Sequence, residues 1–101
     1  MNKNIIHESD EQAAIRTADQ AGSNIYLLVQ TCTDGWDFTF YDEHFKDIDG
    51  GQLDNPELSA AELIDQLLAE YGYSADYEVV DYDECEERVD EAEQRIFSER
   101  V

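Results

Sequence analysis

The sequence predicts an α+β domain, in which an antiparallel sheet of three to four strands carries two helices packed on one face. Three observations support this class. Residues Trp36–Tyr41 alternate between apolar and polar side chains, as expected for a half-buried strand. Two later segments repeat apolar residues at spacings of 3 and 4, as amphipathic helices do. At 101 residues, 42% of them hydrophobic, the chain is expected to form one domain with a modest core.

Residues 1–23 are expected to form an N-terminal segment that is a weak helix or disordered, and the single α+β domain is expected to span residues 24–101. Ser9 and Gln12 are spaced as in a helix cap, which favours a short helix over Asp10–Ala21. The apolar residues of this segment are few, so fraying or disorder is equally compatible with its composition.

Three sequential strands are predicted after this segment. Asn24–Thr33 is rich in β-branched and apolar residues, and the Asp34-Gly35 pair that follows is typical of a hairpin turn. The second strand is Trp36–Tyr41. A short turn then leads to a weaker third strand over residues 45–53, which the Gly50-Gly51 pair is expected to end or bulge.

A helix is predicted to begin at Ser59, because Glu62 follows at the capping-box spacing. Its broad apolar face could cover one side of a small sheet, and Gly72 is the predicted stop. Tyr77–Val80 is short and β-prone, which predicts a fourth strand. The predicted order is therefore (weak α)-β-β-β-α-β-α.

The last helix begins in the most acidic part of the chain, Asp76–Glu93, where ten of eighteen residues are Asp or Glu. Asp81 is a candidate N-cap, with Glu84 at the capping-box spacing. The side of this helix that is expected to face the core carries one apolar stripe, formed by Tyr82, Cys85, Val89, Ala92 and Ile96. The opposite side is therefore mostly carboxylate.

The charge density of this helix lies between those of single-stranded and duplex DNA. Eight carboxylates fall between Asp81 and Glu93, which is one per about 2.4 Å of helix at about 1.5 Å per residue. Duplex DNA carries one charge per roughly 1.7 Å and a single strand one per roughly 3.4 Å. The helix can therefore present a nucleic-acid-like field to a basic partner. The alternative is an ordinary solvated surface helix.

The net charge of −20, from 26 acidic and 6 basic residues, argues against direct binding to nucleic acid or to an anionic membrane. No segment has the ~18 apolar residues of a membrane span, and the N-terminus lacks a secretory signal pattern. We therefore expect a cytoplasmic protein, monomeric or homodimeric, whose partner is a basic protein. Cys32 and Cys85 are expected to be buried reduced thiols, with a disulfide as the alternative.

No metal, cofactor or catalytic site is predicted, and the chain is not expected to be an enzyme. Residues 47–52 come nearest to a calcium loop, but Gly51 and Gln52 stand where such a loop needs a ligand and a glycine. Asp42 and His44 could form a general-base pair. Around them the sequence has no nucleophile pattern, phosphate-binding glycine loop or zinc-ligand spacing.

The predicted partner-binding residues are the carboxylates of the acidic helix and three residues just before it. Tyrosine is included because it is enriched at interface hot spots. The set is Asp76, Tyr77, Glu78, Asp83, Glu84, Glu86, Glu87, Asp90, Glu91 and Glu93.

Residues 34–59, DGWDFTFYDEHFKDIDGGQLDNPELS, resemble small domains encoded on mobile elements of Firmicutes, which occur alone or as accessory modules of large polyvalent proteins. The similarity covers residues 24–95 and includes the Trp-Asp strand, the Tyr-Asp turn and the capped helix. As a small acidic protein in that setting, the chain also resembles anti-CRISPR inhibitors of type II RNA-guided DNA nucleases. This resemblance implies a phage or plasmid protein that disables a nuclease of the bacterial host cell, and it transfers no active-site residue.

The leading hypothesis is an inhibitor that binds the basic nucleic-acid cleft of such a nuclease and blocks guide-RNA loading or DNA binding. Two alternatives remain open at this point. One is an antirestriction protein that mimics DNA, and the other is a regulatory or scaffolding module of a conjugative element whose acids serve solubility.

Overall fold

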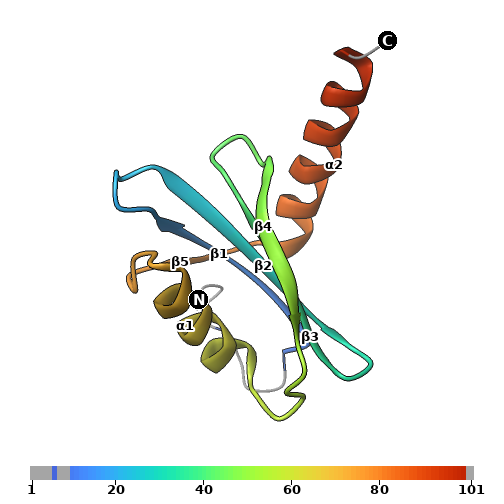
Figure 1. Ribbon diagram of the computed structural model, residues 1–101. Helices are drawn as coiled ribbons and strands as arrows, with labels where there is room; N and C mark the ends of the chain where they lie inside the picture. The colour runs from blue at the N-terminus through green and yellow to red at the C-terminus, as the bar shows by residue number, and fades with distance from the viewer. Residues whose placement is uncertain (1–5, 7–9, 100–101) are drawn as a thin grey trace.

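The computed structural model describes residue 6 and residues 10–99, which form five strands and two helices (Figure 1). In chain order these elements are β1 (Gln12–Ala18), β2 (Asn24–Cys32), β3 (Gly35–Tyr41), β4 (Asp47–Leu53), α1 (Ala60–Tyr71), β5 (Glu78–Val80) and α2 (Tyr82–Glu99). The strands form one antiparallel sheet in the order β4-β3-β2-β1-β5. The α+β class is confirmed, and so is the order of the elements from β2 to α2.

Strand β1 is the main difference from the prediction. It pairs with β2 along all seven of its residues and with β5 on its other edge. These pairings override the weak helix propensity of the segment, because they bury Ala14 on one face of the sheet and Ile15 on the other. The helix over Asp10–Ala21 is therefore wrong, and the sheet has five strands rather than three or four. The proposed cap residue Ser9 lies outside the described residues.

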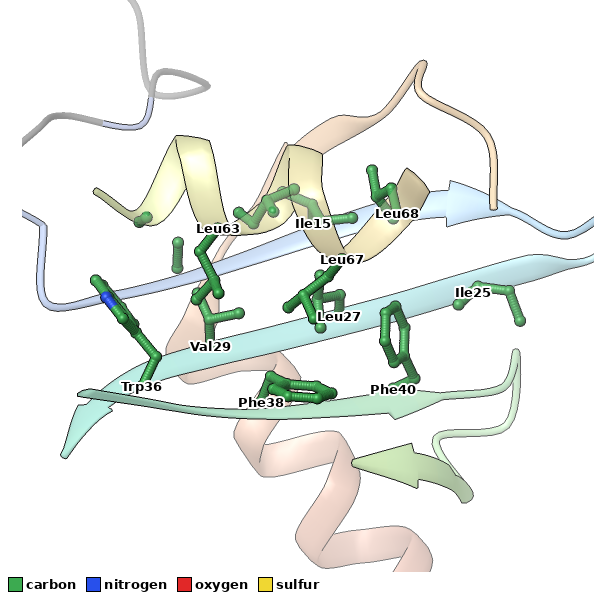
Figure 2. Packing of buried hydrophobic residues seen from close by; sticks show 13 residues of the cluster. Ile15, Ile25, Leu27, Val29, Trp36, Phe38, Phe40, Leu63, Leu67 and Leu68 are labelled. Carbon is green, nitrogen blue, oxygen red and sulfur yellow. The ribbon is translucent and has the colours of Figure 1, made fainter. Parts of the chain in front are cut away.

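The two helices lie on opposite faces of the sheet, not on one face as predicted. Leu63, Leu67 and Leu68 of α1 lie over strands β1 to β3 in Figure 2, and α2 passes behind the sheet on the far side. A smaller cluster joins α2 to that far face and consists of Ala14, Leu28, Phe45, Cys85 and Val89. Neighbouring residues of β1 and β2 are apolar on both faces, so each face needs a helix to cover it.

The larger core lies between α1 and the sheet. Trp36, Phe38 and Phe40 all point to this face, as the alternation in β3 predicts. The indole nitrogen of Trp36 donates a hydrogen bond to the carbonyl of Leu58 at 3.0 Å, which fixes the segment that enters α1. This face of the molecule is therefore a structural core.

Strand β4 runs through its two glycines instead of ending at them. Gly51 lies beside the Phe38 ring, and an added Cβ would come within 3.2 Å of that ring. The register irregularity lies earlier in the strand, where Phe40 faces Asp49 and Tyr41 faces Asp47. The glycines therefore allow close approach to an aromatic side chain, and the expected end or bulge at Gly50-Gly51 is wrong.

The predicted helix caps are confirmed. Ser59 and Glu62 form a reciprocal capping box at the start of α1, and Gly72 ends the helix in a left-handed conformation with φ 76°. At the start of α2, the Asp81 carboxylate accepts a hydrogen bond from the Glu84 amide at 3.0 Å. A side chain just before the helix therefore satisfies one of the free backbone amides in the first turn of α2.

We expect Leu67→Ala to lower the free energy of unfolding by about 2–5 kcal/mol, because it opens a cavity in the main core. Leu67 is 0% exposed. Gln66→Ala on the exposed side of the same helix is the matched control and should change stability by less than about 0.5 kcal/mol. Urea denaturation followed by circular dichroism measures both, and equal effects would contradict this placement of α1.

Candidate partner-binding site

Helix α2 touches the rest of the domain along one narrow stripe. Cys85 and Val89 are buried, and Tyr82 and Ala92 are half-buried at the margin of the same cluster. The C-terminal half of α2 extends away from the sheet (Figure 1). The predicted apolar stripe is therefore confirmed for residues 82–92. The side chain of Ile96, the last predicted member of the stripe, is not among those that the structure describes.

The seven α2 carboxylates of the predicted site are all exposed, as expected. They are Asp83, Glu84, Glu86, Glu87, Asp90, Glu91 and Glu93. Four of them border the two sides, or flanks, of the buried stripe. Glu86 and Asp90 face strand β3, whereas Glu84 and Glu91 lie on the side of Arg88. The two flanks therefore have different surroundings and different charge.

The flank of Glu86 and Asp90 borders an open groove, which we name the α2–β3 groove. Its volume is about 190 Å³, and it is lined by Leu28, Gln30, Asp37, Thr39, Tyr41, Tyr82, Glu86, Val89 and Asp90. Small-molecule sites usually have volumes of roughly 300–1,000 Å³. The groove is therefore smaller than a typical small-molecule site, and its volume is on the scale of one long amino-acid side chain.

Two tyrosines connect the groove to the surrounding acids. The Tyr82 hydroxyl donates a hydrogen bond to the Gln30 side-chain oxygen at 3.1 Å. Burial raises the pKa of Tyr82 to about 12, and the neighbouring Glu86 and Asp83 add to the rise. Burial also raises the pKa of Tyr41, with further contributions from Asp47, Glu93 and Glu86. Both phenols are therefore protonated at neutral pH and can serve as uncharged aromatic surface.

The opposite flank of α2 contains cations as well as acids. The Arg88 guanidinium lies 3.7 Å from Glu84 and 5.9 Å from the centre of the Phe45 ring. Phe45 itself is buried with a left-handed φ of 60° and stacks on Tyr26 at 4.3 Å. This side of the helix therefore holds α2 to the loop after β3, and its charge is partly neutralised.

The three predicted site residues before α2 do not join the α2 carboxylates. Tyr77 packs against the α1-side core, and Glu78 forms an ion pair with Arg16 on the neighbouring strand. The Asp76 carbonyl lies 3.2 Å from the Thr17 hydroxyl, which fixes the backbone there. Asp76 and Glu78 are exposed, but they lie at the β5 edge and not beside the α2–β3 groove.

Asp37 lines the groove but is absent from the residues that the sequence predicts. It lies on β3 opposite Gln52, on the face that α2 occupies. The alternation in residues 36–41 places Asp37 with Thr39 and Tyr41 away from the main core. This alternation predicts that Asp37 faces away from the main core, but it does not predict that α2 lies on that side. The sequence alone therefore could not identify Asp37 as a neighbour of the α2 carboxylates.

No metal-binding group of three His, Cys, Asp or Glu side chains occurs among residue 6 and residues 10–99. Residues 47–53 form strand β4, a geometry that does not suit a calcium loop. The Asp42 carboxylate accepts hydrogen bonds from the backbone amides of His44 and Lys46, so it caps a turn. The imidazole of His44 lies instead 3.4 Å from Glu43, fully on the surface.

Both cysteines are free, as predicted, but only Cys85 is buried. Cys85 is 4% exposed, and burial raises its pKa to about 11. Cys32 is half-buried near the end of β2. In the described part of the chain, no helix has the length and apolar content needed to cross a membrane.

The sequence matches the family model described as large polyvalent protein-associated domain 16 over residues 10–92. No curated protein and no solved structure matches the chain. The match covers β1 to most of α2, so the chain belongs to this family. The predicted resemblance to accessory domains of polyvalent mobile-element proteins is thereby supported, and the match begins well before residue 24.

We expect Tyr82→Phe to make the domain more resistant to alkaline unfolding. The pKa of Tyr82 is about 12 in the folded protein against an ordinary value of 10.0. Its contribution to stability is therefore complete below pH 10 and is lost as the pH rises through about 12. Phenylalanine cannot ionise, so the unfolding midpoint in a pH titration followed by circular dichroism should move to higher pH.

Gln30→Ala is the control for this titration, because it removes the hydrogen-bond acceptor of Tyr82 but keeps the phenol. It should lower stability at neutral pH by about 1 kcal/mol and retain the alkaline sensitivity. An unchanged alkaline midpoint in Tyr82→Phe would show that Tyr82 ionises as freely as in the unfolded chain.

Proposed function

We propose that this member of the large polyvalent protein-associated domain 16 family is a non-enzymatic inhibitor protein of mobile-element origin. Its target is the basic nucleic-acid cleft of a type II CRISPR RNA-guided DNA nuclease, in the cytoplasm of a bacterial host cell. Binding blocks guide-RNA loading or DNA binding. The family match supports the mobile-element origin, and the resemblance of the sequence to anti-CRISPR inhibitors suggests the nuclease.

The observation that carries this proposal is the array of exposed carboxylates on α2. Within the described residues, only Glu84 of the seven α2 carboxylates in the predicted site has an ion-pair partner. The array stands on a capped helix that the sheet anchors along one side, so its charges have a fixed spacing. Because the backbone of this helix is already ordered, binding to a complementary surface requires little further ordering of the backbone.

The physical mechanism is electrostatic competition with nucleic acid. Nucleases of this class hold the guide heteroduplex in a positively charged channel and read a short motif with arginines. An acidic helix that enters such a channel neutralises the same cations that would otherwise contact phosphate groups. Long-range attraction also accelerates association, and the effect decreases as salt screens the charges. Inhibition should therefore weaken as ionic strength rises.

The same kind of binding and inhibition assay distinguishes the two alternative functions from the proposed one. An antirestriction DNA mimic would use the same carboxylates, and parallel inhibition assays on a restriction enzyme and on the RNA-guided nuclease separate it. A regulatory or scaffolding module of a conjugative element would not bind the nuclease even at low salt.

Neutralising the outer carboxylates of α2 should weaken inhibition. Glu86→Gln/Glu87→Gln/Asp90→Asn removes three negative charges from the net −20. Exposed ion pairs contribute on the order of 0.5 kcal/mol each, so we expect about a tenfold loss of affinity for the nuclease. Fluorescence anisotropy at several salt concentrations measures it, and the variant should also show a shallower salt dependence.

The control removes three exposed acids near the opposite face of the domain, Glu57→Gln/Asp65→Asn/Glu70→Gln. Its net charge equals that of the α2 variant, so general attraction is matched. The control should inhibit almost as well as the unmodified protein. If the two variants lost affinity equally, or if neither lost any, α2 would not be the contact surface.

The step that is blocked can be found by changing the order of addition. The protein is added to the nuclease before guide RNA, after guide RNA, or after target DNA. Inhibition only in the first order indicates blocked guide loading. Inhibition in the first two orders indicates blocked DNA binding.

A further inference from the structure

We infer that the α2–β3 groove binds an arginine side chain presented by the basic partner, between the two tyrosines and the carboxylates at the rim. This rests on the proposed function in taking the partner to be a basic protein, and it names the chemical group that the partner presents. The groove exists because α2 packs on β1 and β2, through Ala14 and Leu28, and leaves the same face of β3 open.

The floor of the groove is apolar and its walls are aromatic. Leu28 and Val89 are 7% and 8% exposed, and Tyr41 and Tyr82 are half-buried beside them. A long cationic side chain buries its aliphatic part against such a floor while its charged end stays near polar groups. The groove therefore provides contacts that a row of carboxylates on a fully solvated helix does not provide.

The rim of the groove carries charge of one sign. Asp37 comes from β3, and Glu86 and Asp90 come from successive turns of α2. All three are exposed, and none has an ion-pair partner among the described residues. Within the described part of the chain, no cation lines this groove, whereas Arg16 and Arg88 line the groove on the other flank of α2. Charge complementarity therefore directs a basic partner to the Asp37 side of the helix.

The combination of rings and carboxylates favours arginine over lysine. A guanidinium group is planar, stacks on aromatic rings and can pair with a carboxylate through two hydrogen bonds. A lysine ammonium is a compact and strongly hydrated charge, so it gains less from the tyrosines. The groove volume of about 190 Å³ lies below the roughly 300–1,000 Å³ of small-molecule sites. That volume is on the scale of one long side chain.

The test uses the full chain, isotopically labelled for NMR, and two peptides of equal length and charge. One peptide alternates glycine with arginine, and the other has lysine at each arginine position. We expect the arginine peptide to bind about fivefold more tightly. Its chemical-shift changes should centre on Asp37, Tyr41 and Glu86 and leave the Arg88 flank unaffected.

Two sets of variants separate the rings from the charges. Tyr41→Leu/Tyr82→Leu should remove the preference for arginine and retain the weaker binding of the lysine peptide. Asp37→Asn/Glu86→Gln/Asp90→Asn should weaken binding of both peptides. Because this variant retains both tyrosines, it still tests the groove if the double leucine variant folds poorly. The matched control on the other flank, Glu43→Gln/Glu84→Gln/Glu91→Gln, removes the same charge and should leave the arginine preference unchanged.

Equal binding of the two peptides, or shift changes spread over all acidic surfaces, would overturn the inference. The result is independent of the nuclease assay. An arginine preference at the groove without nuclease inhibition would reject the proposed function alone. Conversely, neutralising the groove flank and neutralising the Arg88 flank could reduce nuclease inhibition by the same amount. That result would keep α2 as the contact surface but would reject the groove as the centre of the contact.

Discussion

The two-sided burial of strands β1 and β2 determines the rest of this fold. Ile15 and Leu27 are buried on one face of these strands, and their neighbours Ala14 and Leu28 are buried on the other. A sheet that is apolar on both faces at its centre must be covered twice. Helix α1 covers the larger aromatic face, and α2 covers the smaller one. The position of the acidic helix is therefore a consequence of alternation in two strands that contain none of its charges.

The local parts of the fold can be predicted from the sequence, and the long-range parts cannot. Alternation in β3 and the side-chain caps at Ser59 and Asp81 depend on neighbouring residues, so their patterns are visible in the chain. Strand β1 is stable because β2 and β5 pair with it, and neither pairing leaves a local pattern. A prediction that lacks β1 gives no reason to cover the second face of the sheet. Both helices are then predicted to pack on the same face.

The candidate site divides in the same way. Seven exposed carboxylates of α2 follow from the helix period, because the buried stripe leaves only one side for them. The difference in charge between the two flanks of α2 cannot be predicted from the helix period, because it depends on which strands lie beneath each flank. Asp37 joins one flank through the register of β3, and Arg16 joins the other through the register of β1. Tyr77 and Glu78 lie apart from the α2 carboxylates, because Tyr77 packs against the main core and Glu78 pairs with Arg16.

Because α2 contacts the sheet through few residues, most of its sequence is not constrained by folding. Only Cys85 and Val89 of this helix are buried in the part whose side chains are described, so nearly every other position can accept substitution without loss of the fold. If the proposed contact surface is correct, substitutions on α2 would alter the partner that the domain recognises while the core of the sheet and α1 stay constant. Under the function proposed above, this separation of the contact surface from the core would let recognition evolve faster than the fold.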